Sequence, residues 1–144
     1  MGFKNILVPY DASSYSERAF KKALDVAEKD NSKITVVTVI EGVYAANIGF
    51  SSKINPKIIR EQTKAAEKFI NRLKMAAEKR GVPFSLKILQ GSSIVKTLVK
   101  FTKSHKPDLI VMGSHGRTGL NRLILGSVAN DMVQHVECPI MVVK

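Results

Sequence analysis

The sequence predicts an α/β protein, in which an open parallel sheet of five strands is doubly wound by helices on both faces, as in Rossmann-like domains. Two observations support this prediction. Short apolar runs rich in β-branched residues alternate with longer segments whose apolar residues recur at helical spacing. Parallel neighbouring strands need crossover connections, which the intervening helices supply. A length of 144 residues suits one domain, and we expect residues 1–144 to form it.

The first elements follow ordinary start and stop signals. Ile6 to Val8 is a short apolar strand. Ser14 to Glu17 has the pattern of a capping box, in which Ser14 and Glu17 each satisfy a free amide of the first helical turn. The helix that it opens should end near Asp30. Ile34 to Ile40 is rich in β-branched residues and predicts the second strand.

A long irregular stretch separates the second strand from the next helix. Residues 41–55 contain glycines and serines without a regular apolar pattern, and are either a flap beside a site or a surface connection without a role. Pro56 begins a long helix, which Gly81 ends. Phe84 to Leu89 alternates in polarity, as a strand near the sheet edge does. A further helix with Ile94, Leu98 and Phe101 on one side follows it.

Glycines follow the fourth strand at a defined spacing. The apolar run Leu109 to Met112 ends at a segment in which the fixed positions are Gly113, Gly116, Gly126 and Ser127. Glycine permits positive φ and lets bare N–H groups approach an anion, and successive N–H groups form a concave donor surface. Ser127 should cap a helix whose N-terminus favours the same anion. Arg117 and Arg122 can add charge-assisted bonds, so this stretch predicts a phosphate-binding loop.

Composition limits the classes of partner. The net charge of +11 could attract acidic molecules, but the lysines between residues 53 and 106 alternate with apolar residues, as on solvated helix faces. Neither zinc-finger spacing nor an aromatic RNA-binding signature is found, which argues against nucleic acid as a partner. No apolar run approaches the roughly 20 residues that span a bilayer, and no signal peptide precedes the first strand. We therefore expect a cytoplasmic protein that does not contact a membrane.

The spacing G-x2-G-x9-G-[ST] resembles the signature of the nucleotide-binding, ATP-binding type of the universal stress protein family, and it is complete at its four fixed positions. The resemblance covers essentially the whole chain. It implies the strand order 3-2-1-4-5, with ATP in the crevice between the carboxyl ends of strands one and four. Mg²⁺ or Mn²⁺ could accompany ATP through its phosphates. The resemblance also implies a homodimer formed through the edge strand Ile140 to Val143, which would otherwise stay uncovered.

The same resemblance implies roles for individual residues. Asp11, which follows Pro9 and Tyr10 at the end of the first strand, would contact the ribose or the base, or else would only cap the following turn. Tyr10 is larger than the residue often found there, which affects the shape of the pocket. The other implied contacts are Val39 beside the adenine, Met112 and Gly113 at the ribose, Gly116 and Gly126 at the phosphates, Ser127 and Val128 closing around them, and His115 and Arg117 as polar and cationic neighbours.

The leading functional hypothesis is an adenine-nucleotide-binding stress or signalling module, in which ATP biases a conformation or an assembly. The alternatives are a slow ATPase that uses the same site and a basic interaction protein that does not depend on nucleotide. A Walker-type loop and the G-x-G-x-x-G dinucleotide fingerprint are both absent. No catalytic triad or carboxylate pair is identifiable either, so no residue is assigned a catalytic role.

Overall fold

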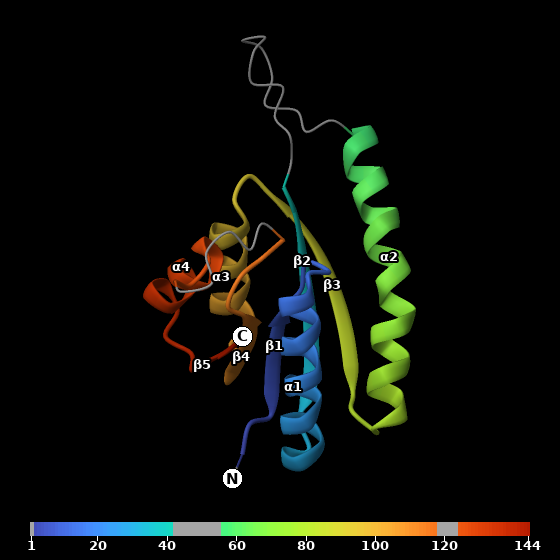
Figure 1. Ribbon diagram of the computed structural model, residues 1–144, viewed down its shortest axis with the longest axis vertical. Helices are drawn as coiled ribbons and strands as arrows, with labels where there is room; N and C mark the ends of the chain where they lie inside the picture. Colours follow the sequence, from blue (N-terminus) through green and yellow to red (C-terminus); the bar gives the residue numbers. More distant parts are fainter. Residues whose placement is uncertain (1, 42–55, 118–123) are drawn as a thin grey trace.

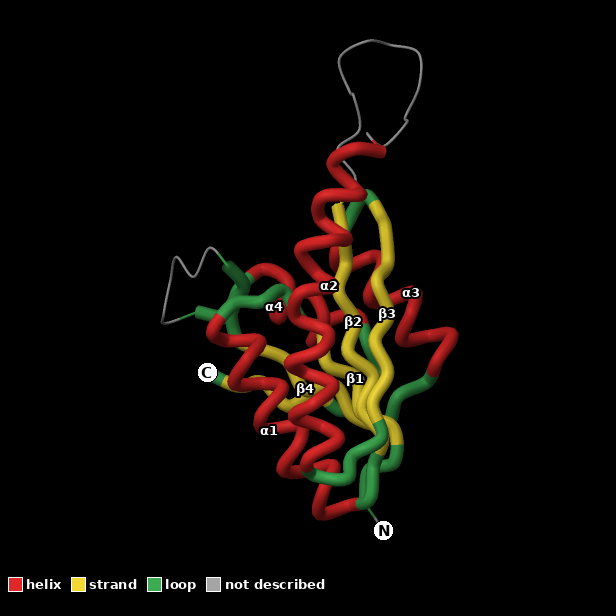
Figure 2. Tube along the Cα trace, turned by 90° about the vertical axis from the view of Figure 1, so that its right-hand side faces the viewer, coloured by secondary structure: helices red, strands yellow, loops and turns green. Residues whose placement is uncertain are grey.

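The computed structural model describes residues 2–41, 56–117 and 124–144. Five parallel strands form one sheet in the order β3-β2-β1-β4-β5, which confirms the predicted fold class and strand order. Figure 2 shows β3, β2, β1 and β4 side by side, from right to left. The strands are β1 (Asn5–Pro9), β2 (Lys33–Glu41), β3 (Phe84–Gly91), β4 (Leu109–Gly113) and β5 (Ile140–Val143).

Four helices cover the two faces of this sheet. They are α1 (Ser14–Asp30), α2 (Pro56–Lys79), α3 (Ile94–His105) and α4 (Ser127–His135). Figure 1 shows α3 and α4 on the left of the sheet and α2 on its right. Because side chains alternate along a strand, Ile6 and Val8 pack into the core formed with α1 and α2, whereas Leu7 packs into the core with α3 and α4. Both layers therefore hold β1 at the centre of the sheet.

The start of α1 differs from the sequence prediction. Its N-cap is Ser13, not Ser14, and the Ser13 hydroxyl accepts a hydrogen bond from the Ser16 amide at 3.1 Å. The reason lies in the preceding turn, where the Asp11 carboxylate accepts a hydrogen bond from the Ser13 amide at 2.9 Å and fixes the turn one residue earlier. Glu17 does not return to the cap, so the predicted capping box is wrong.

Other element ends agree with the sequence signals. Asn31 has left-handed backbone with φ of 55° and closes α1, and Pro56 begins α2. Gly81, with φ of 67°, follows the end of α2, and β3 is an edge strand because it pairs with β2 alone. The stretch predicted to be irregular begins at residue 41, but Glu41 ends β2, and residues 42–55 lie outside the described residues. Among the described residues, no helix combines the length and the apolar character needed to cross a membrane.

Candidate functional site

A cavity of about 630 Å³ lies at the carboxyl ends of β1, β2 and β4. Its wall also includes residues of α2 and the beginnings of α3 and α4. The structure brings all of the predicted contacts to this wall: Pro9, Tyr10, Asp11, Val39, Met112, Gly113, His115, Gly116, Arg117, Gly126, Ser127 and Val128. Arg122, also part of the predicted phosphate loop, lies outside the described residues. A strand order that makes β1 and β4 neighbours is what assembles these separate segments.

The turn between β1 and α1 forms one side of the cavity. Asp11 has the structural role considered above, because its Oδ1 accepts a hydrogen bond from the Ser13 amide. Its Oδ2 lies toward Gly116, 3.0 Å from the position that a Cβ of Gly116 would take. Across the cavity, Arg117 Nε donates to the Asp11 carbonyl oxygen at 2.7 Å. This bond joins the turn after β1 to the loop after β4, so both sides of the cavity are held together.

Ala12, which sequence reasoning missed, has an unusual backbone at this turn. Its φ of 66° lies in the left-handed region, which disfavours residues with a Cβ. Strained backbone of this kind is concentrated at ligand sites and switch regions. Nothing in the residue type signals it, since alanine is an ordinary helix former.

The glycines of the loop act differently from the prediction. Among the described glycines, φ between 20° and 160° occurs only at Gly2 and Gly81, so the expectation that Gly113, Gly116 and Gly126 use positive φ is wrong. Gly113 and Gly126 instead lie where neighbouring atoms pack too closely to leave room for a side chain. A Cβ on Gly113 would lie 2.7 Å from Cβ of Tyr15, and one on Gly126 would lie 3.0 Å from Cα of His115. The absence of a Cβ at these glycines therefore allows α1 and the residues after β4 to pack directly against them.

The N-terminus of α4 faces the cavity without a side-chain cap. The N-cap is Gly126, not Ser127 as predicted, and it provides no side-chain acceptor. The Gly126 amide donates to the Ser114 carbonyl oxygen at 2.7 Å, which fixes the entry to the helix. The first amide groups of a helix have no intrahelical acceptor, and together with the helix dipole they attract anions. Ser127 and Val128, whose N–H groups have no intrahelical acceptor, line the cavity together with the cation Arg117.

His115 has a buried ring nitrogen without a partner. Its Nδ1 lies 2.9 Å from the Ser114 hydroxyl, and its ring packs beside that of Tyr15, with 5.2 Å between centroids. Within the described parts of the chain, its Nε2 is the one buried side-chain nitrogen or oxygen without a hydrogen bond. Leaving such an atom unsatisfied costs about 1–3 kcal/mol, so the orientation of this ring is suited to an additional polar partner.

Tyr10 extends into the core between α1 and α2. Its hydroxyl donates to the Glu17 carboxylate and accepts from Arg72 Nη2 at 3.0 Å, while Arg72 also pairs with Glu17. Burial raises the pKa of the Tyr10 hydroxyl, and the hydrogen bond and charge of Glu17 raise it further. Tyr10 as a whole is 5% exposed, and its ring lies edge-on to Phe69. The larger side chain at this position is therefore accommodated in the core, where it links β1, α1 and α2.

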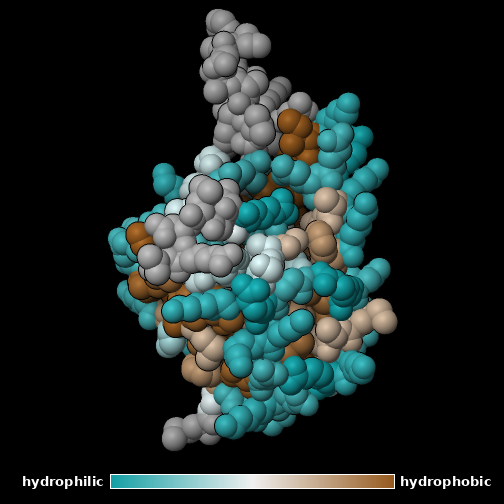
Figure 3. Space-filling view, viewed as in Figure 1, coloured by the Kyte–Doolittle hydropathy of each residue, from teal (hydrophilic) through white to brown (hydrophobic). Residues whose placement is uncertain are grey.

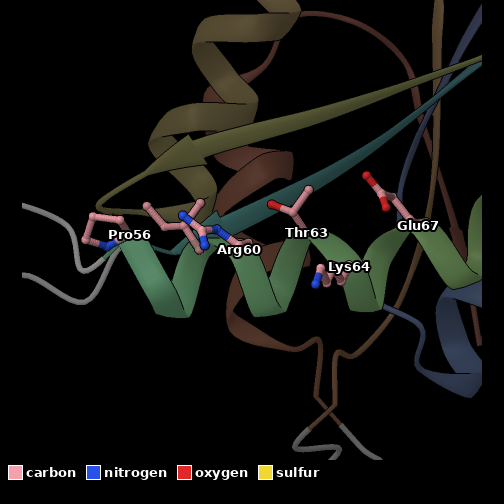
Figure 4. A pocket seen from close by; sticks show the side chains of 6 residues that line it. Pro56, Arg60, Thr63, Lys64 and Glu67 are labelled. Carbon is pink, nitrogen blue, oxygen red and sulfur yellow. The ribbon is translucent and has the colours of Figure 1, made fainter.

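A second hollow of about 490 Å³ lies along α2, toward its N-terminal end. Figure 4 shows that the labelled side chains Pro56, Arg60, Thr63, Lys64 and Glu67 all come from this one helix. Ligand sites are usually concave and combine groups from several elements. In the described residues no other element contributes to this hollow, so the cavity at the strand ends is the candidate site.

Known proteins resemble this chain over nearly its full length. The model of the universal stress protein family matches residues 2–144. Universal stress protein MJ0531 of Methanocaldococcus jannaschii is 32% identical over 143 residues, which cover 99% of this chain and 82% of that protein.

Solved structures share the fold. The hypothetical protein MJ0577 superposes with a TM-score of 0.84 at 27% identity, covering 100% of this chain and 97% of that one. UspA from Lactobacillus plantarum has a TM-score of 0.85 at 24% identity, covering 100% and 99%. Lower-identity universal stress proteins were solved with dAMP (Archaeoglobus fulgidus, TM-score 0.70), AMP (Arabidopsis thaliana, 0.67) and cAMP (0.73). From the family match over residues 2–144 and the relative that is 32% identical, the chain belongs to the universal stress protein family.

Proposed function

We propose that this universal stress protein, folded as one domain over residues 1–144, is an ATP-binding module of a stress response or signalling system. The observation that carries this proposal is that residues from several separate elements line a single cavity. Contacts expected at the ends of β1, β2 and β4 and at the start of α4 line one cavity, although Pro9 and Val128 lie 119 positions apart in the chain. Adenine nucleotides bound to solved relatives support the same class of ligand.

The donors in the cavity suit the different parts of a nucleotide. Phosphates would lie at the first turn of α4, where the Ser127 and Val128 amides have no side-chain acceptor from the N-cap. Arg117 would add a charge-assisted bond, and His115 Nε2 would gain the partner that it lacks. The base would lie toward Val39 at the end of β2. A volume of about 630 Å³ is within the range of small-molecule sites.

A divalent cation would depend on the nucleotide for most of its ligands. Within the described ranges, no group of three or more His, Cys, Asp or Glu side chains is arranged to hold a metal ion. Mg²⁺ prefers oxygen ligands and commonly binds through substrate phosphates with one or two carboxylates. The Oδ2 of Asp11 lies toward Gly116, a position proposed for the phosphates and not for the ribose or base, so Asp11 is the carboxylate that would approach Mg²⁺ or Mn²⁺ held by ATP.

Calorimetric titration with ATP and with adenosine tests the proposal. ATP should bind saturably and at least roughly tenfold more tightly than adenosine, because hydrogen bonds to charged phosphate oxygens contribute about 1.5–3 kcal/mol each. Equal affinities would mean that the start of α4 does not hold phosphate. Absence of binding by folded protein that native mass spectrometry shows to be nucleotide-free would refute the proposed function.

We further propose a homodimer through β5, which is an edge strand with β4 on one side only. The carbonyl oxygens of Pro139 and Val143 accept bonds from β4, so alternation turns the backbone groups of Ile140 and Val142 to the open edge. On α4 and the segment before it, Ile124 is 64% and Val133 49% exposed. Hydrophobic atoms gather on the left of Figure 3, where α4 lies. A second copy could cover both the edge and these side chains.

Replacing Val142 with proline should convert this dimer to monomer. The substitution removes an outward N–H and is tolerated best at an edge strand, so the sheet itself should persist. Sedimentation equilibrium gives the mass, and Val142→Thr is the matched control because it keeps both the amide and the branched Cβ. A folded proline variant with the same mass as the wild-type dimer would rule out pairing through β5.

A further inference from the structure

Helix α3 carries a row of lysines on its solvent side. Lys96, Lys100 and Lys103 are exposed and follow the i, i+4, i+7 spacing that places residues on one side of a helix. We call these three residues the α3 lysine row. The opposite side of α3 carries Ile94 and Leu98, which line the nucleotide cavity. The row therefore faces away from the proposed ATP site.

The α3 lysine row has no acidic partner. The ion pairs among the described residues join Lys22, Arg72, Lys74 and Arg80 to carboxylates of α1 and α2, and none involves α3. Between Gly81 and Arg117 the chain contains one acidic residue, Asp108. Its carboxylate accepts hydrogen bonds from the backbone amides of Lys4 and Asn5, at 2.8 and 2.9 Å. The positive charge along α3 is thus uncompensated within the described structure.

The stability of α3 explains Lys103, a cation in the last turn that favours the helix dipole, but it does not explain Lys96 and Lys100. Lys96 lies in the first turn, which contains no acidic residue, and a cation there opposes the helix dipole. Lys96 and Lys100, four residues apart, and Lys100 and Lys103, three apart, are like charges at spacings that bring side chains together and destabilise a helix. Among the described helices, α1 has an acidic residue in its first turn, Glu17, whereas α2 and α4, like α3, have none. Local rules broken repeatedly without compensation are typical of functional surfaces.

We propose that the α3 lysine row binds the phosphate backbone of duplex nucleic acid, without sequence preference. From the sequence alone these lysines are typical of solvated helix faces; the fold adds that they form one uncompensated row, about 10 Å long at 1.5 Å per residue. A duplex offers a continuous line of phosphates, with one charge per roughly 1.7 Å of its axis. Lysine is a compact point charge, which suits phosphate and not the bidentate reading of bases.

Two features of the exposed side of α3 favour a duplex over other polyanions. The exposed large hydrophobic residues of the described chain are Met75, Ile124, Leu125 and Val133, and none belongs to α3. A membrane-surface helix would need apolar residues beside its lysines to enter the bilayer. The exposed residues of α3 also include no phenylalanine, tyrosine or tryptophan, on which the bases of a single strand would stack.

The test compares two triple variants by fluorescence anisotropy with a labelled duplex DNA of random sequence. One carries Lys96→Glu, Lys100→Glu and Lys103→Glu. The matched control carries Lys64→Glu, Lys68→Glu and Lys79→Glu on the exposed side of α2, with the same change of net charge. The α3 variant should bind at least tenfold more weakly than wild type. The slope of log affinity against log salt should become shallower by about 2.7, or about 0.9 for each phosphate that the protein no longer neutralises.

The control should keep the wild-type salt slope. Thermal unfolding should show the α3 variant to be about as stable as wild type, because the acid that Lys96→Glu places in the first turn offsets the cation that Lys103→Glu removes from the last turn. Equal weakening in both variants would overturn the proposal, since net charge alone would then explain binding. Failure of wild type to bind the duplex would also overturn it, as would lysine-dependent binding to vesicles of anionic lipid without binding to the duplex.

Discussion

Replacing Gly113 with alanine should destabilise the fold by roughly 2 kcal/mol or more, because overpacking at a rigid contact costs about 1–3 kcal/mol. The added Cβ would lie 2.7 Å from Cβ of Tyr15 and 2.9 Å from its carbonyl carbon. Neither atom can move alone, since Tyr15 belongs to the first turn of α1 and Gly113 pairs with Val143 of β5 in the sheet. The helix must shift away from β4, which would disturb the core around β1.

Urea unfolding measures this loss, and Gly116→Ala is its control. A Cβ on Gly116 would meet one atom only, the end of the Asp11 side chain at 3.0 Å, which can turn aside. The Gly116 variant should therefore lose much less stability than the Gly113 variant. Equal stability of the two would contradict the packing role of Gly113. Because Gly113→Ala should disturb the fold, weak ATP binding by this variant would not by itself show that Gly113 contacts the nucleotide.

The fold was largely predictable because its signals are local. Apolar runs at Ile6 to Val8 and Leu109 to Met112 and the proline at position 56 each depend on neighbours within a few residues. The order of the strands came from the resemblance to the family, since periodicity alone gives five parallel strands without an order. Helix starts were less predictable. Ser13 caps α1 because Asp11 fixes the preceding turn, and adjacent serines at 13 and 14 offer no local signal to distinguish them.

Sequence reasoning predicted residues that the structure brings to one cavity, but it did not predict the contacts that each of them makes. The motif spacing and the wider resemblance identified some of the residues that line the cavity, but contacts between distant residues decide what each one does. Gly113 is small because of Tyr15, 98 positions earlier, and Tyr10 reaches Arg72 of α2. Likewise, the unpaired Nε2 of His115 is apparent only once the ring is packed beside Tyr15. No local pattern of residue types predicts these contacts between residues that are far apart in the chain.

Replacing Ser127 with proline should weaken ATP binding by at least tenfold while leaving the fold intact. Ser127 is the first residue of α4, where proline is favoured because its φ suits the helix and the missing N–H has no intrahelical acceptor. Gly126 precedes it with φ of −61° and ψ of 161°, the extended conformation that a residue before proline prefers. The substitution therefore removes one donor from the proposed phosphate cradle without opposing the local backbone.

Two comparisons assign that loss to the amide. Ser127→Ala removes the hydroxyl and keeps the N–H, so calorimetry should find the alanine variant much closer to wild type in its affinity for ATP. Adenosine, which has no phosphate, should bind all three proteins alike. If the proline and alanine variants bound ATP equally well, the first turn of α4 would not hold the phosphates. If adenosine binding fell together with ATP binding, the proline would have altered the whole cavity, and urea unfolding would show whether α4 had shifted.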